Sequence, residues 1–117
     1  MLGVVELLAA FSLPFTATLH APTHTPKVGA AWPISIRVTD LQGHPTRARV
    51  TMRLLFGGIP VGKVDGGRVF TFVGTWREPK GEEIEFPPAA RGQRLTFQAI
   101  VTVRGRATKL NYWVRPR

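Results

Sequence analysis

Residues 31–40, with the sequence AWPISIRVTD, decide the fold class of this 117-residue chain. Every second position in this stretch is a large apolar residue: Trp32, Ile34, Ile36 and Val38. Polar side chains fill most of the positions between them. An alternation of period two is the pattern of a β-strand that buries one face and exposes the other. The stretch therefore predicts a strand in a sheet with one face against a core.

The same alternation recurs along the chain after Pro14. Predicted strands cover residues 15–21, 31–40, 46–56, 59–64, 68–76, 84–86, 95–104 and 106–115. About seven to eight short strands separated by turn residues are typical of an antiparallel β-sandwich. A closed barrel stays open as the alternative, because it needs the same alternation. We expect residues 59–64 at a sheet edge, since Pro60 lacks a backbone donor.

Most aromatic side chains fall on the predicted inner faces. The expected aromatic core consists of Trp32, Phe56, Phe70, Phe72, Trp76, Phe97 and Tyr112. Trp113 follows Tyr112 directly, so one of the two must face outward. An exposed Trp113 near Lys109 and Arg115 is a candidate contact residue for a partner. The alternative is an edge aromatic that residues 1–13 cover.

The composition fits one small domain that folds without covalent cross-links. The apolar share of 44% is enough for a hydrophobic core. A chain of 117 residues is too short for two independent cores. Cysteine is absent, and this excludes disulfides, thiolate metal sites and cysteine nucleophiles. We expect an apolar N-terminal segment over residues 1–13 and a β-sandwich over residues 14–117.

Residues 1–13 (MLGVVELLAAFSL) differ from the rest of the chain, because they are apolar and carry a single charge, Glu6. The predicted docking residues share one face of a helix: Val4, Leu7, Leu8 and Phe11. Three roles stay open for this segment: an export segment, an element that docks on this domain or a neighbour, and a membrane-surface anchor. The segment is too short to span a membrane, which takes about 20 apolar residues.

Positive charge gathers toward the C-terminal end of a chain whose net charge is +9. No acidic residue follows Glu85, and seven bases do: Arg91, Arg94, Arg104, Arg106, Lys109, Arg115 and Arg117. Together with Trp113 these residues are the predicted contact surface for a polyanion or a protein partner. An ordinary solvated surface is the alternative.

Few residues are placed to carry catalysis or to bind a metal. His20 and His24 are weak candidates for a copper site, and we expect them instead to be solvated or to cap turns. The acids of residues 78–85 could bind a cation weakly, although a solvated edge is the simpler interpretation. The chain has no nucleophile motif and no phosphate-binding loop. We therefore expect no enzyme, no cofactor and no small-molecule substrate.

Several short motifs resemble the opening strands of bacterial immunoglobulin-like domains. They are residues 26–29 (PKVG), 32–40 (WPISIRVTD) and 43–45 (GHP), and residues 94–114 are similar to the closing hairpin of such domains. In this turn Asp40 can bond backbone amides and Gly43 can adopt a positive φ. The YtkA-like and invasin-like modules of exported bacterial proteins look similar. The chain departs from antibody domains in lacking a cysteine pair and in the position of Trp32.

The resemblance implies an exported or surface location and an adhesive, linking or accessory role. We expect an immunoglobulin-like β-sandwich, extracellular or in the cell envelope, that binds or spaces partner proteins or assembles with itself. Membrane contact is expected through residues 1–13, if at all. The first alternative is an accessory subunit on a polyanionic assembly such as a virion or an envelope complex. The second is a copper-handling sandwich domain.

Overall fold

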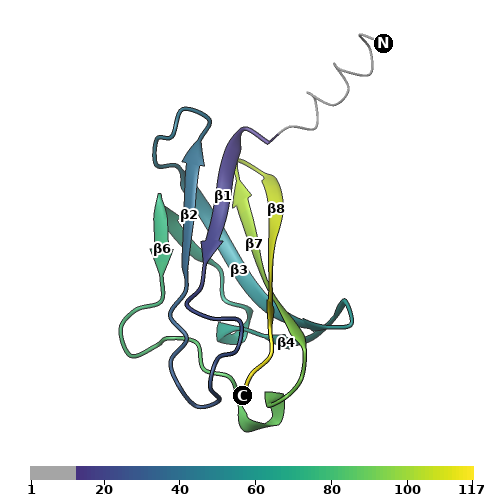
Figure 1. Cartoon of the computed structure of the whole chain (residues 1–117). Helices are drawn as coiled ribbons and strands as arrows, with labels where there is room; N and C mark the ends of the chain where they lie inside the picture. The colour runs from purple at the N-terminus through teal and green to yellow at the C-terminus, as the bar shows by residue number, and fades with distance from the viewer. Residues whose placement is uncertain (1–12) are drawn as a thin grey trace.

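The computed structural model describes residues 13–117, which form an all-β sandwich of two antiparallel sheets (Figure 1). The docking role predicted for Val4, Leu7, Leu8 and Phe11 falls on residues 1–12, outside the described residues. The smaller sheet has the order β1-β2-β6, with β1 (Phe15–His20), β2 (Ser35–Asp40) and β6 (Thr75–Arg77). Within the described residues, no helix has the length and apolar character that crossing a membrane requires.

The larger sheet has five strands in the order β4-β3-β7-β8, and β5 also pairs with β3. Its members are β3 (Arg47–Phe56), β4 (Ile59–Lys63), β5 (Phe70–Val73), β7 (Leu95–Val103) and β8 (Arg106–Val114). Two short 3-10 turns, η1 (Asp65–Gly67) and η2 (Pro88–Ala90), lie in the connections. The sheets correspond to strands A-B-E and C′-C-F-G of an immunoglobulin-like sandwich. The predicted fold class and strand number are confirmed.

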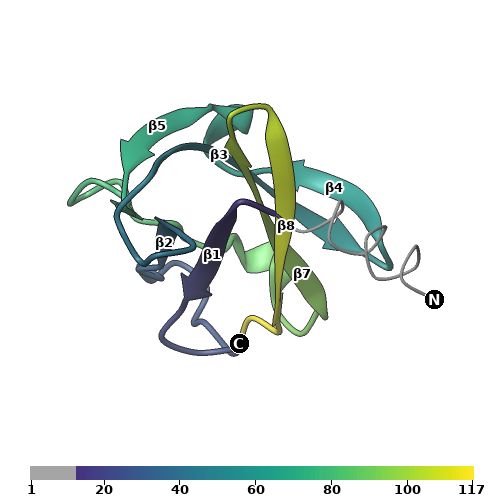
Figure 2. The same ribbon diagram turned by 90° about the horizontal axis from the view of Figure 1, so that it is seen from above.

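The core lies between the two sheets, which Figure 2 shows from above. Ile36 and Val38 of β2 are fully buried, as are Phe97 and Val101 of β7. These are the positions that the alternation predicts to face inward. Each such side chain contributes about 2 kcal/mol through its removal from water. Trp32 lies just before β2 and is also buried. Its backbone forms an isolated antiparallel bridge with Ile84, in the connection between β6 and β7.

Two strands, β4 and β5, share one edge of β3 (Figure 2). β5 pairs with the first half of β3 and β4 with the second half, so β4 lies at the sheet edge that Pro60 predicts. Phe56, at the end of β3, is 51% exposed, so its predicted place in the core is wrong. The reason is strand length: β3 has ten residues and β1 and β2 six each, so the smaller sheet does not reach the end of β3.

The strand predicted over residues 68–76 is two strands in different sheets. β5 pairs with β3 in the larger sheet and β6 pairs with β2 in the smaller one, and the chain crosses between the sheets at Gly74. Gly74 has a φ of +79°, which an L-residue adopts only with strain. Its amide donates to the Thr46 carbonyl at 3.1 Å, and its carbonyl accepts from the Val38 amide at 2.7 Å. One residue thus joins the backbones of both sheets.

We expect Gly74→Ala to lower the free energy of unfolding by about 2 kcal/mol or more. The positive φ costs an alanine about 1 kcal/mol, and its Cβ would lie 3.0 Å from Pro45 Cβ. Gly81→Ala is the matched control, because Gly81 has a φ of +89° and nothing within 4 Å of an added Cβ. Urea unfolding monitored by Trp fluorescence measures both. Equal losses for the two variants would contradict the close packing at the sheet crossing.

Candidate functional site

An apolar groove of about 570 Å³ opens at the end of the sandwich where β3 finishes and β7 begins. We call it the β4 groove, because β4 forms one of its walls. Its large apolar lining residues are Leu54, Phe56, Val61, Ile84, Phe86 and Leu95. Lys63, Asp65 and Glu85 supply the charged groups of the lining. The groove is therefore suited to an apolar ligand rather than to a charged one.

The β4 groove follows from the length mismatch between the sheets. The end of β3 projects beyond the smaller sheet, and residues 84–90 lie across the gap instead of a further strand. The groove continues onto the β3–β4 hairpin, where Phe56, Ile59 and Val61 are 51%, 67% and 58% exposed. Sequence reasoning missed this surface, because it assigned Phe56 to the core. One feature of the sequence could have revealed this surface: Ile59 and Val61 flank Pro60 in a strand that was predicted to lie at a sheet edge.

The residues predicted to contact a polyanion do not form one patch. The β7–β8 turn carries two of them, Arg104 and Arg106. Four lie near the opposite end of β8: Arg91 and Arg94 in the connection before β7, and Arg115 and Arg117 after β8. The nine residues of β8 separate the two groups, which corresponds to about 30 Å. Lys109 lies between them and is exposed.

Two C-terminal arginines, Arg115 and Arg117, hold the connection between β1 and β2 in place. Arg115 donates its amide to the His24 carbonyl at 2.7 Å, and its Nε to the Gly92 carbonyl at 3.3 Å. Arg117 donates its amide to the Pro26 carbonyl at 2.9 Å, and its Nε to the Thr25 carbonyl at 3.2 Å. These guanidinium groups have a structural role that the charge count does not reveal.

Trp113 belongs to an aromatic stack at the edge of β8. The His24 ring is parallel to the rings of Tyr112 and Trp113, with centroids 4.0 Å from each. Neighbouring residues of a strand point to opposite faces, so His24 lies between the two rings. The Arg94 guanidinium lies over the Trp113 ring at 4.6 Å. Trp113 is 40% exposed as predicted, but these contacts fix it in place.

The two histidines weighed for copper have different surroundings. His24 is held in the aromatic stack, and its Nδ1 lies 2.7 Å from the Trp113 carbonyl oxygen. His20, at the end of β1, is exposed. Among residues 13–117, no three or more His, Asp or Glu side chains are grouped to hold a metal ion. The described residues therefore offer copper no ligand set around His20 and His24.

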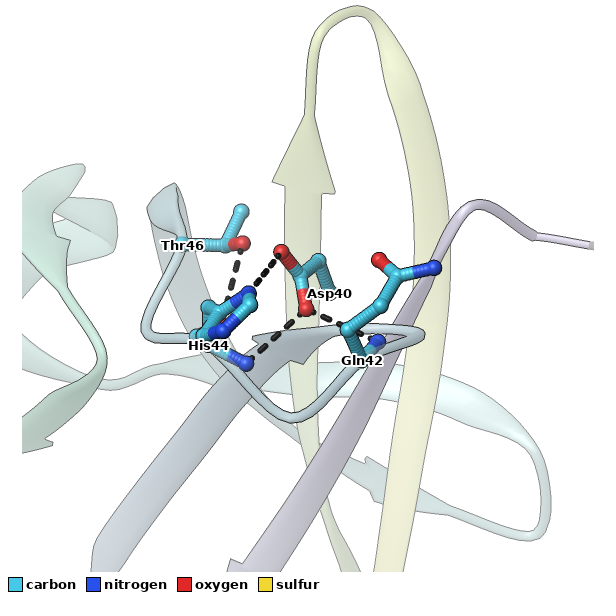
Figure 3. Close-up of polar contacts among 4 residues, drawn as sticks. All are labelled: Asp40, Gln42, His44 and Thr46. Carbon is cyan, nitrogen blue, oxygen red and sulfur yellow. Dashed lines mark hydrogen bonds and ion pairs between the residues drawn. The ribbon is translucent and has the colours of Figure 1, made fainter.

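Asp40 organises the turn between β2 and β3 (Figure 3). Its Oδ1 accepts from the amides of Gln42 and His44 at 2.9 and 2.8 Å, and its Oδ2 lies 3.2 Å from His44 Nδ1. The amide of His44 is the largest cause that lowers the pKa of Asp40. Gly43 completes the turn with a φ of +87°. The predicted capping role of Asp40 is confirmed.

Glu78 is the acid with the most unusual surroundings. Both of its carboxylate oxygens are shielded from water and lack a hydrogen-bond partner among the described residues. Desolvation raises the pKa of Glu78 to about 8, and the neighbouring Asp65 carboxyl group adds to the rise, as do Glu82 and Glu83. Glu78 is therefore largely protonated at neutral pH in the folded protein. A protonated carboxyl group is a poor cation ligand, so the cation site considered for residues 78–85 loses this acid.

Comparison with protein-family models, with curated proteins and with solved structures gives no match. The resemblance to YtkA-like and invasin-like modules therefore stays a prediction. The strand order and the buried alternation establish the fold without it.

We expect Glu78→Gln to stabilise the protein above about pH 5 and to leave it unchanged near pH 4. The unfolded chain loses the Glu78 proton near pH 4.5 and the folded chain near pH 8. Between these values the folded state binds more protons, so stability falls as the pH rises. Glutamine mimics the protonated form and removes this loss. Thermal unfolding from pH 4 to 9 measures the difference, with Glu85→Gln as an exposed control. A gain in melting temperature that does not depend on pH would contradict the assignment.

Proposed function

We propose that this protein is a non-enzymatic, immunoglobulin-like interaction module whose β4 groove binds residues 1–12 of a second copy of the chain. The observation that carries the proposal is the continuous apolar surface formed by the groove and the exposed side chains of the β3–β4 hairpin. Exposed apolar surface of this kind is typical of protein–protein contacts. Covering Phe56, Ile59 and Val61 contributes about 1 kcal/mol for each side chain.

Residues 1–12 suit the β4 groove because they can present an apolar face. Residues 1–12 contain a single charge, and Val4, Leu7, Leu8 and Phe11 have the spacing of one side of a helix. A helix that lays such a face into an apolar groove is a common mode of peptide recognition. Nine of these twelve residues are apolar.

The reach of the segment favours a second copy over the same chain. The described part of the chain begins at Leu13, just before β1, at the end of the sandwich where β7 finishes (Figure 1). The β4 groove lies where β7 begins, and the nine residues of β7 span about 30 Å. A 12-residue helix spans about 18 Å. A helical segment starting at Leu13 falls short of its own groove and can enter that of a neighbour.

This contact joins two different surfaces of the chain, so it is heterologous. Such contacts produce closed rings or open chains of copies rather than a two-fold dimer. An assembling module agrees with the linking role that the resemblance implies. On the same ground alone we propose an extracellular or cell-surface setting.

The test is the oligomeric state of the full chain, measured by analytical ultracentrifugation after intact mass has shown that residues 1–12 are present. We expect concentration-dependent association that Val61→Glu abolishes, because it places a charge in the groove. Leu7→Glu should abolish it as well, from the other side of the contact. Val73→Glu is the matched control, since Val73 is 60% exposed on β5, away from the groove.

Association that persists in the Leu7→Glu variant would overturn the choice of occupant. Association lost equally in the Val73→Glu variant would show a general charge effect and overturn the choice of surface. A monomer up to millimolar concentration, or a purified chain that lacks residues 1–12, would overturn the whole proposal.

A further inference from the structure

A basic depression lies at the end of the larger sheet opposite the β4 groove. It has a volume of about 750 Å³ and lies over the beginning of β3, one end of β5 and the end of β7. The polar side chains that line it are Arg47, Arg49, Arg104, Thr46, Thr71 and Thr102. Asp40 is the one acid among the lining residues.

Strand register brings these arginines together. Arg49 pairs with Thr102 of β7 on one side and with Thr71 of β5 on the other. The same antiparallel register, continued by two residues, places Arg47 beside Arg104 at the β7–β8 turn. Arg47 and Arg49 also point to the same side of β3, because they are two residues apart. The guanidinium groups of Arg47 and Arg49 therefore lie on one face with that of Arg104, which is more than fifty residues away in the sequence.

These positive charges have no internal partner in the part of the chain that the structure describes. Neither an ion pair nor a side-chain hydrogen bond involves Arg47, Arg49 or Arg104 there. The carboxylate of Asp40 forms no ion pair with these arginines, since it accepts the two turn amides and faces His44. The lining retains a net charge of +2 when three arginines and one aspartate are counted.

The donors identify the chemistry of the ligand. A guanidinium group presents paired N–H donors that match the oxygens of phosphate, often in a bidentate arrangement. The hydroxyls of Thr71 and Thr102 beside the arginines add further donors to the same oxygens, whereas the Thr46 hydroxyl donates to the His44 carbonyl at 3.5 Å. No aromatic residue lines the depression, so stacking of nucleobases does not contribute. The volume exceeds that of one phosphate group and accommodates neighbouring groups of a chain.

We propose that this depression binds successive phosphate groups of a polyanion, with Arg47, Arg49 and Arg104 as the main contacts. The site differs from the one that the sequence predicts, since it takes Arg104 from that set and adds two arginines of β3. It is independent of the β4 groove and of self-association.

The test is titration of the full chain with tripolyphosphate, followed by calorimetry and by amide chemical shifts at constant ionic strength. We expect saturable binding at one site, with the largest shifts at Thr46, Thr71 and Thr102. Arg49→Gln and Arg104→Gln should each weaken binding about ten-fold or more, since each removes a charge-assisted contact. Arg37→Gln is the matched control, because Arg37 is an exposed strand arginine in the other sheet.

A control variant that stays within two-fold of the wild-type affinity supports the site. Equal weakening by Arg37→Gln and Arg49→Gln would show attraction by net charge alone and would overturn it. Titration without saturation, or shifts confined to the opposite end of β8, would overturn it as well. Val61→Glu should leave tripolyphosphate binding unchanged, which separates this site from the proposed self-assembly.

Discussion

The packing of Trp32 is the interaction on which the rest of the structure depends. Its side chain is 1% exposed and its Nε1 donates to the Thr23 carbonyl at 2.9 Å, so the buried indole is fully satisfied. The ring meets Phe86 and Phe97 edge-on at 5.2 and 5.3 Å. Trp32 therefore holds together the connection before β2, the loop that walls the β4 groove, and the centre of the larger sheet. Tyr112, 5.9 Å away, extends this packing to the stack at the edge of β8.

The ten residues of β3 give the molecule two different ends. One end of this strand projects past the smaller sheet and exposes Phe56 beside the β4 groove. The other end carries Arg47 into the basic depression. Apolar and basic surfaces thus lie at opposite ends of one long strand. We propose self-association through one end of this module and phosphate binding through the other.

The alternation of side chains was enough to predict the sandwich and the buried face of β7, and Pro60 predicted the edge position of β4. It could not show the crossing at Gly74, because a glycine inside an alternating run does not reveal its φ. It placed Phe56 in the core, since the period of a strand gives the direction of a side chain but not whether an opposite layer covers it. It also missed the pairing of Arg47 with Arg104, which depends on a register between distant strands.

Trp32 is enclosed between the two sheets, and nuclear Overhauser contacts of its indole ring test this packing most directly. We expect cross-peaks from the Trp32 ring to Phe86, Phe97 and Tyr112, and an indole N–H that exchanges slowly with deuterated water. An indole N–H that exchanges within the dead time, without contacts to Phe97, would contradict the packing described for this protein.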